Sequence, residues 1–508
     1  MNNEVRWGGL SRVPHDLFPS RLLPWIRNGW VSGSIGVIIL LSLVTGVLTG
    51  APPSYLVGQM VLGCSIFASL LLLSDHPLLN PVQAAIPAFY WWFGIGPAVI
   101  ATHKALMGYP GDALYVQEAS QEALWIVAIG LPLYAVGARM TLSWFATRNV
   151  YARFLMPHQR GYRVSTVVTL FVIGLLCSLS IWLLNQIGII GVEDINYLGG
   201  TITNIWWIGL ISAVGMVTVF ARSAVLSEMV QSGRESSRVL KWMAVVVIVQ
   251  SLLAAMTSGW KSTFILTGMY VLCAYVSKHQ RIPWISIATG LLLYLLIIEP
   301  FVSAGRSLAQ SLGISTTQER SRVYAELISE GRMFEQLSMR EINIESPFRG
   351  MHLFASEVVR RNTPATGEWA GDTIVWGLAT LIPRRLSPNK PDMNVGNFFS
   401  RTIGVDLNLS SSRDYFTNTS IALPFEFVGN FGWLAGIVSF GCIGVFWASL
   451  TSWILSTQRL SDHPLTPWLT ANVLLMESAV GHYLAYWRSM LFPLVTVFVV
   501  WIVFRRRL

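Results

Sequence analysis

The chain has 508 residues, of which 53% are hydrophobic and only 12% are charged. Soluble domains carry about 25% charged residues, so this composition excludes an ordinary soluble protein and indicates a membrane protein with many spans. The formal net charge of +9 does not indicate a nucleic-acid site, because most basic residues fall in short connections where membrane topology favours them.

Cysteine placement argues against a disulfide framework or a zinc site. Cys64, Cys177, Cys273 and Cys442 all fall within apolar runs, so we expect buried thiols. The first apolar run, 31–49, follows an arginine-containing tail and lacks a small-x-small cleavage site. We therefore predict that it stays as a span and is not removed as a signal peptide.

Apolar runs of spanning length recur along the chain and predict an all-α polytopic fold with roughly twelve transmembrane helices. They lie at 31–49, 56–73, 84–102, 122–142, 164–187, 202–221, 241–258, 262–277, 283–300, 430–455, 465–485 and 489–504. The predicted organisation is a cytoplasmic tail (1–30), a membrane domain of about nine spans (31–300), a long polar loop (301–421) and a second membrane domain of about three spans (422–508), which ends in a short basic tail.

Charge sets the predicted orientation. With the N-terminus in the cytoplasm, nineteen basic residues fall on the inner side and three, Lys104, Lys261 and Arg488, fall in the short outer connections. Cytoplasmic loops of membrane proteins carry the excess of Lys and Arg. We therefore predict that both termini are cytoplasmic and that the loop 301–421 faces outward.

The long loop exceeds the usual length of an unstructured connection, so we expect it to have structure of its own. The charged stretch 319–342 has a periodic apolar side, which predicts a surface helix. A second helix is predicted over 347–361, with Phe354 and Val358 on one side. The apolar run 373–382 is too short to span and suits a re-entrant or protein-buried helix.

Arginines in the loop are the predicted substrate-binding groups. A guanidinium binds phosphate through two hydrogen bonds and stays charged, so a cluster beside the membrane suits a lipid-linked diphosphate. The favoured positions flank membrane entry points or the proline-rich turn 381–392: Arg306, Arg384, Arg385, Lys390 and Arg413. The alternative is that these residues form salt bridges, since acidic and basic residues are nearly balanced in the loop.

Two residues are candidates for the catalytic base. His352 is the only histidine in the long loop and suits proton transfer from a sugar hydroxyl; the alternative is a packed surface residue. Glu477 falls within an apolar run, where an ionisable group is costly and indicates function. Glu426, His482 and Arg488 are further site candidates close to the ends of predicted spans.

Several motifs are absent from the sequence. It has no G-x-x-x-x-G-K-[ST], so no ATP-driven machine is indicated, and no Asp-x-Asp in any predicted outer loop. We therefore expect no metal and no cofactor. A transfer reaction without metal requires protein cations to neutralise a departing diphosphate.

Three stretches resemble the bacterial O-antigen and exopolysaccharide repeat-unit polymerases, the Wzy-type family. The segment 258–262, SGWKS, resembles a Ser-Gly-x-(Lys/Arg)-Ser turn that precedes a mid-chain span in that family. The segment 382–391, IPRRLSPNKP, resembles its I-P-(R)…P-x-K-P element in the large periplasmic loop. The segment 424–432, PFEFVGNFG, resembles a stretch ending in Asn-Phe-Gly that opens the span after that loop.

The resemblance implies a fold like that of type C membrane glycosyltransferases and a location in the bacterial inner membrane. It also implies a polyprenyl-diphosphate-linked glycan as substrate, with the growing chain transferred to the sugar hydroxyl of an incoming lipid-linked unit. A flippase and a chain-length regulator are the implied partners, besides membrane lipids, and no nucleic acid is expected.

Two alternatives stay open. An O-antigen ligase, which moves the finished glycan to another lipid, has a similar layout. A glycan-lipid flippase or other transporter more often shows paired repeats and sites at the bilayer midplane. The concentration of polar residues in one outer loop favours chemistry at the membrane surface over transport.

Overall fold

The structure is a computed structural model of the whole chain. It describes residues 53–73, 81–100, 118–148, 164–186, 217–232, 238–258, 261–279, 283–302, 351–379, 421–455 and 466–473, together with isolated positions elsewhere. Within these ranges all regular structure is helical. Polar backbone groups of a helix are satisfied inside the helix, which is what a segment in lipid requires.

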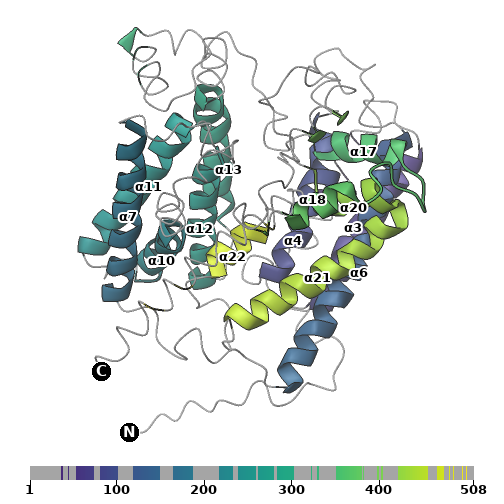
Figure 1. Cartoon of the computed structure of the whole chain (residues 1–508), viewed down its shortest axis with the longest axis horizontal. Coiled ribbons are helices and arrows are strands. Elements are labelled where there is room, and N and C mark those ends of the chain that lie inside the picture. Colours follow the sequence, from purple (N-terminus) through teal and green to yellow (C-terminus); the bar gives the residue numbers. More distant parts are fainter. Residues whose placement is uncertain are drawn as a thin grey trace.

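The helices are α3 (Pro53–Leu73), α4 (Pro81–Tyr90), η1 (Trp91–Ile95), α6 (Glu118–Arg148), α7 (Val164–Gln186), α10 (Val217–Ser232), α11 (Arg238–Ser258), α12 (Lys261–His279), α13 (Trp284–Leu293), η5 (Tyr294–Ile298), α17 (Met351–Arg361), α18 (Asp372–Ala379), α20 (Leu423–Phe431), α21 (Trp433–Leu455) and α22 (Thr466–Val473). In Figure 1, α7 and α10 to α13 lie on one side, and α3, α4, α6, α17, α18, α20 and α21 lie on the other. Helix α22 packs against α4, α10 and α12 and so joins the two sides.

Four helical stretches are long and apolar enough to cross a membrane: Pro53–Leu73, Gln121–Phe145, Trp284–Val302 and Trp433–Ser452. Each exposes large apolar side chains at its surface, such as Met60, Met140, Ile285 and Leu434. Exposed apolar surface on this scale needs lipid or a partner to cover it. The protein is therefore an all-α membrane protein, and this part of the sequence-based prediction is confirmed.

Two helices differ in their ends from the predicted spans. Helix α10 continues to Ser232, beyond the end of the span predicted at 202–221. Polar residues such as Ser223 and Ser227 lower the hydropathy there, but they are buried. The span predicted at 430–455 is interrupted at Gly432, whose φ of +90° ends α20 before α21 begins. A positive φ is readily adopted by glycine alone.

Where the structure describes the 301–421 segment, helices occur in the stretches where the sequence predicts them. Helix α17 ends at Arg361 as predicted, and Phe354 and Val358 are both buried. The apolar run 373–382 contains α18, which buries Thr373 and Gly377 but exposes much of its other side. Of the stretch 319–342, the described positions include an exposed ion pair between Arg322 and Glu326.

Helices α6 and α21 approach each other closely enough to touch through their backbones. A Cβ atom at Gly137 would lie 2.6 Å from the carbonyl oxygen of Gly441, and one at Gly444 would collide with the carbonyl oxygen of Tyr134. Small residues at such crossings let membrane helices gain dispersion energy without a hydrophobic driving force. This contact fixes the position of α21, and through it the position of α20.

We predict that Gly444→Ala destabilises the protein, because the added methyl group forces α21 away from α6. Overpacking of this kind costs about 1–3 kcal/mol. The matched control is Gly290→Ala in α13, where a Cβ atom meets nothing within 4 Å and alanine favours the helix. Thermal unfolding in detergent should show a lower midpoint for Gly444→Ala only; equal midpoints would contradict the close crossing.

Candidate functional site

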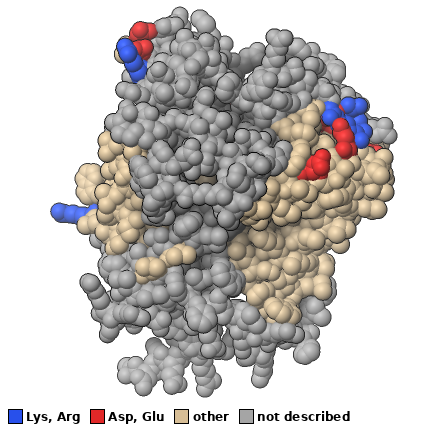
Figure 2. Space-filling view, in the orientation of Figure 1, with Lys and Arg blue, Asp and Glu red and all other residues tan. Residues whose placement is uncertain are grey.

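A polar unit lies beside the spanning helices and is formed by α17, the connection 362–371, α18 and α20. Helix α17 packs on α6 and α20, and α18 packs on α20. Figure 2 shows one group of charged side chains at the upper right, over this unit, and others at the upper left and left edge; the tan surface below the upper-right group lacks them. We call residues 351–379 together with α20 the polar unit.

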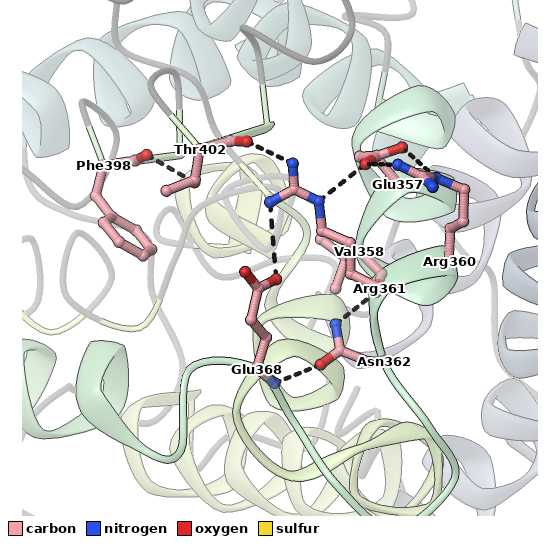
Figure 3. A network of polar contacts seen from close by, with 8 residues as sticks. All are labelled: Glu357, Val358, Arg360, Arg361, Asn362, Glu368, Phe398 and Thr402. Carbon is pink, nitrogen blue, oxygen red and sulfur yellow. Dashed lines mark hydrogen bonds and ion pairs between the residues drawn. The ribbon is translucent and has the colours of Figure 1, made fainter.

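A charged network holds the C-terminal half of α17 (Figure 3). Arg360 donates from Nε to Oε2 of Glu357 at 2.9 Å and from Nη2 to Oε1 at 2.6 Å. Arg361 donates from Nε to the same Oε1 at 2.9 Å and from Nη2 to the carbonyl oxygen of Thr402 at 2.7 Å. Its Nη1 lies 3.7 Å from Oε2 of Glu368.

The charge state of Glu357 follows from these contacts. Burial disfavours the carboxylate, but the hydrogen bonds and charges of Arg360 and Arg361 outweigh it and hold the pKa of Glu357 below its usual range. The same pairing raises the pKa of Arg360. Both arginines also lie in the last turn of α17, where positive charge complements the helix dipole. They are structural partners of Glu357.

The connection after α17 is tied to α20 and α21 by backbone and amide hydrogen bonds. Asn362 donates to the carbonyl oxygen of Val358 at 2.5 Å and accepts from the N–H of Glu368 at 2.6 Å. The first N–H groups of α21, at Trp433 and Leu434, donate at 3.1 Å to the carbonyl oxygens of Thr363 and Pro364. N–H groups in the first turn of a helix lack an intrahelical acceptor, so the polar unit caps α21.

Glu426 is the one acidic residue of α20 and is fully buried. Its Oε2 accepts a short hydrogen bond from the backbone N–H of Val480. Asn430, one turn later, donates at 2.7 Å both to Oγ1 of Thr373 and to the carbonyl oxygen of Glu426. The Oε1 atom of Glu426 makes no hydrogen bond of ordinary geometry with the part of the chain that the structure describes.

Burial dominates the protonation of Glu426. It raises the pKa of this carboxyl to about 7, against the opposing effects of the Val480 N–H and the Thr373 hydroxyl, which favour the ionised form. Carboxyl groups whose pKa lies near the working pH can gain and lose a proton under ordinary conditions. Among the site candidates that the structure describes, Glu426 therefore has the most unusual electrostatics.

His352 lies in the first turn of α17 and is buried, with 3% of its surface exposed. Its backbone carbonyl accepts a hydrogen bond from Ser356 at 2.6 Å. The imidazole is therefore packed inside the polar unit and does not lie on the surface.

The remaining predicted site residues lie outside the described residues: Glu477, Arg306, Arg384, Arg385, Lys390, Arg413, His482 and Arg488. Of all the sequence-based site candidates, the structure thus places His352 and Glu426, on two helices that pack against each other.

Sequence reasoning missed the residues that organise this unit. The spacing of Glu357, Arg360 and Arg361 is the i, i+3 and i, i+4 pattern that places charges together on a helix, so this network was detectable. The pairing of Asn430 with Thr373 joins positions 57 residues apart. No local pattern signals such a contact.

Comparisons of this chain with models of protein families, with curated proteins and with solved structures found no match.

We predict that Glu357→Gln lowers stability at neutral pH by about 1–3 kcal/mol, since it removes the carboxylate that binds both Arg360 and Arg361 in a partly buried site. A lowered pKa means that Glu357 stabilises the fold above the pKa of the unfolded chain and loses this effect as pH falls through the folded-state pKa. The deficit of the variant should therefore shrink below about pH 4.

The matched control is Glu326→Gln, which removes an ion pair of the same i, i+4 spacing whose two side chains are 81% and 54% exposed. Such exposed pairs contribute about 0.5 kcal/mol or less. Thermal unfolding at pH 7 and pH 4 measures both variants. Equal, small effects of the two substitutions would show that burial adds nothing to the Glu357 network.

Proposed function

We propose that this protein is a glycosyltransferase-type polymerase that joins lipid-linked oligosaccharide repeat units at the outer face of the bacterial inner membrane. The observation that carries the proposal is the polar unit: part of the 301–421 segment is folded and docked on spanning helices α6 and α21. A rigid polar platform beside the bilayer suits a reaction on the headgroup of a lipid carrier.

The finer layout belongs to the same proposal. We propose about twelve spans, both termini in the cytoplasm and the 301–421 segment in the periplasm, since this arrangement satisfies the distribution of basic residues. The architecture is then that of a type C glycosyltransferase. A flippase supplies the repeat units and a chain-length regulator limits the product.

In the proposed reaction, the bond between the anomeric carbon of the growing glycan and its polyprenyl diphosphate breaks. A new bond forms from that carbon to a hydroxyl oxygen of the incoming repeat unit. The diphosphate departs with negative charge, which positioned cations can stabilise without metal. The hydroxyl proton passes to a base, for which His352 and Glu477 are the candidates.

The contacts of Arg361 argue against a role for this arginine in binding the diphosphate. Arg361 is committed to Glu357, Glu368 and Thr402 inside the polar unit. A cation already paired with a carboxylate has little charge left for a ligand. The proposal therefore rests on the arginines of the proline-rich turn, Arg384 and Arg385, with Lys390, Arg306 and Arg413 as supporting cations.

The test is a gene deletion complemented with wild type and with the double variant Arg384→Ala/Arg385→Ala, followed by gel analysis of surface and lipid-linked glycans. We expect the deletion to replace a polymer ladder with single repeat units. The double variant should fail to restore the ladder, with a loss of about 100-fold in polymer.

Arg322→Ala is the matched control, since Arg322 belongs to the same segment but pairs with Glu326 at the surface. It should restore the ladder, and membrane levels of all variants are measured by immunoblot. Full-length polymer that stays on its lipid carrier in the deletion strain would favour a ligase or an export step. An unchanged glycan pattern would overturn the proposal and favour transport of another solute.

A further inference from the structure

Glu426 joins two parts of the chain that are far apart in sequence. Its carboxylate accepts a hydrogen bond from the backbone N–H of Val480, 54 positions away. Val480 is helical, and its side chain packs against the hydrophobic core. Backbone N–H groups of a helix are available to outside acceptors mainly in its first turn. Glu426 thus accepts this N–H from outside the helix and links α20 to Val480.

Among the residues that the structure describes, few groups around this carboxyl would favour its charge. The charged or titratable residues on the described elements packed against α20 are His352, Glu357, Arg360 and Arg361 on α17, Asp372 on α18 and Cys442 on α21. In the described residues, the groups that favour ionised Glu426 are the Val480 N–H and the Thr373 hydroxyl, both neutral. Arg360 and Arg361 bind Glu357 instead.

The two oxygens of Glu426 have different roles. Oε2 needs to be an acceptor, because the Val480 N–H points at it. Oε1 is buried and makes no ordinary hydrogen bond with the described residues. A proton on Oε1 removes the buried charge and leaves the acceptor at Oε2 in place. An ionised carboxylate in the same position carries a desolvation cost that only hydration can relieve.

We propose that Glu426 is a proton-binding site that controls the contact between α20 and Val480. With the proton bound, the contact is closed as in the structure. When the proton leaves to water, the carboxylate draws water into the contact and the hydrogen bond to Val480 loosens. This proposal does not depend on the glycan reaction, so it can be tested separately from the proposed function.

The direction of the pH effect follows from the raised pKa of about 7. A hydrated glutamate in an open state has its pKa near 4.3, so the closed state binds the proton more tightly. The closed contact is therefore fully stable below about pH 4, weakens as pH rises toward 7 and changes no further above it. Glutamine at this position keeps an acceptor oxygen and cannot ionise, so it should keep the contact closed.

The experiment is hydrogen–deuterium exchange of the full-length protein in lipid nanodiscs between pH 5 and 9, corrected for intrinsic exchange. In the wild type, exchange of the peptide that contains Val480 should rise about 10-fold or more between pH 5 and 8. Glu426→Gln should abolish this step. The control Glu357→Gln, in the same polar unit, should retain it. A pH step of equal size in Glu426→Gln, or none in the wild type, would overturn the proposal.

A second variant and a direct measurement of the carboxyl test the proposal even if Glu426→Gln fails to fold. Thr373→Val removes a hydroxyl that favours the ionised form, so it should move the midpoint of the step to higher pH; an unmoved midpoint contradicts the assignment. Infrared difference spectra of wild type against each variant report the protonated carboxyl itself.

The same measurements in sodium-free and sodium-containing buffer distinguish the binding of a proton from the binding of a metal cation. A step that follows the sodium concentration instead of pH would also overturn the proposal.

Discussion

The junction at Gly432 is the constraint on which the polar unit depends. Its φ of +90° turns the chain between α20 and α21, and a Cβ atom there would lie 2.7 Å from the carbonyl oxygen of Thr363. The connection after α17 can therefore run directly over the start of α21 and cap its first N–H groups. The first N–H groups of a membrane helix need such acceptors, because lipid offers none.

This junction is itself held in place by the crossing of α6 and α21. Glycines at the crossing bring the two backbones into contact, so α21 cannot slide or rotate without breaking close packing along its length. Helix α17 rests on the same α6. The polar unit and α21, the spanning helix that follows it, thus both pack on α6. The placement of the helices in the polar unit therefore depends on packing in the membrane domain as well as on contacts within the unit.

The polar unit contains two carboxyl groups whose pKa values are shifted in opposite directions. Two arginines hold the pKa of Glu357 below its usual range, whereas burial raises the pKa of Glu426 to about 7. The first arrangement gives rigidity that is insensitive to pH over most of the neutral range. The second makes the contact between α20 and Val480 dependent on pH.

The sequence by itself determined the class of the protein and much of its local structure. Apolar runs of spanning length predicted the four membrane-crossing helices, because lipid demands a continuous apolar stretch. Proline and helical periodicity predicted a helix that ends at Arg361, and the i, i+4 spacing from Glu357 to Arg361 encoded their pairing. These features depend on residues close together in the chain, so a short stretch of sequence is enough to predict them.

Only the tertiary structure decided the break at Gly432, the extension of α10 to Ser232 and the environment of Glu426. Glu426 looks like any acid near the start of a span. Its burial, its contact with Thr373 and its bond to Val480 arise from residues more than fifty positions away. The pKa of a carboxyl depends on the atoms around it in space, and no spacing along the chain specifies which distant segments supply them.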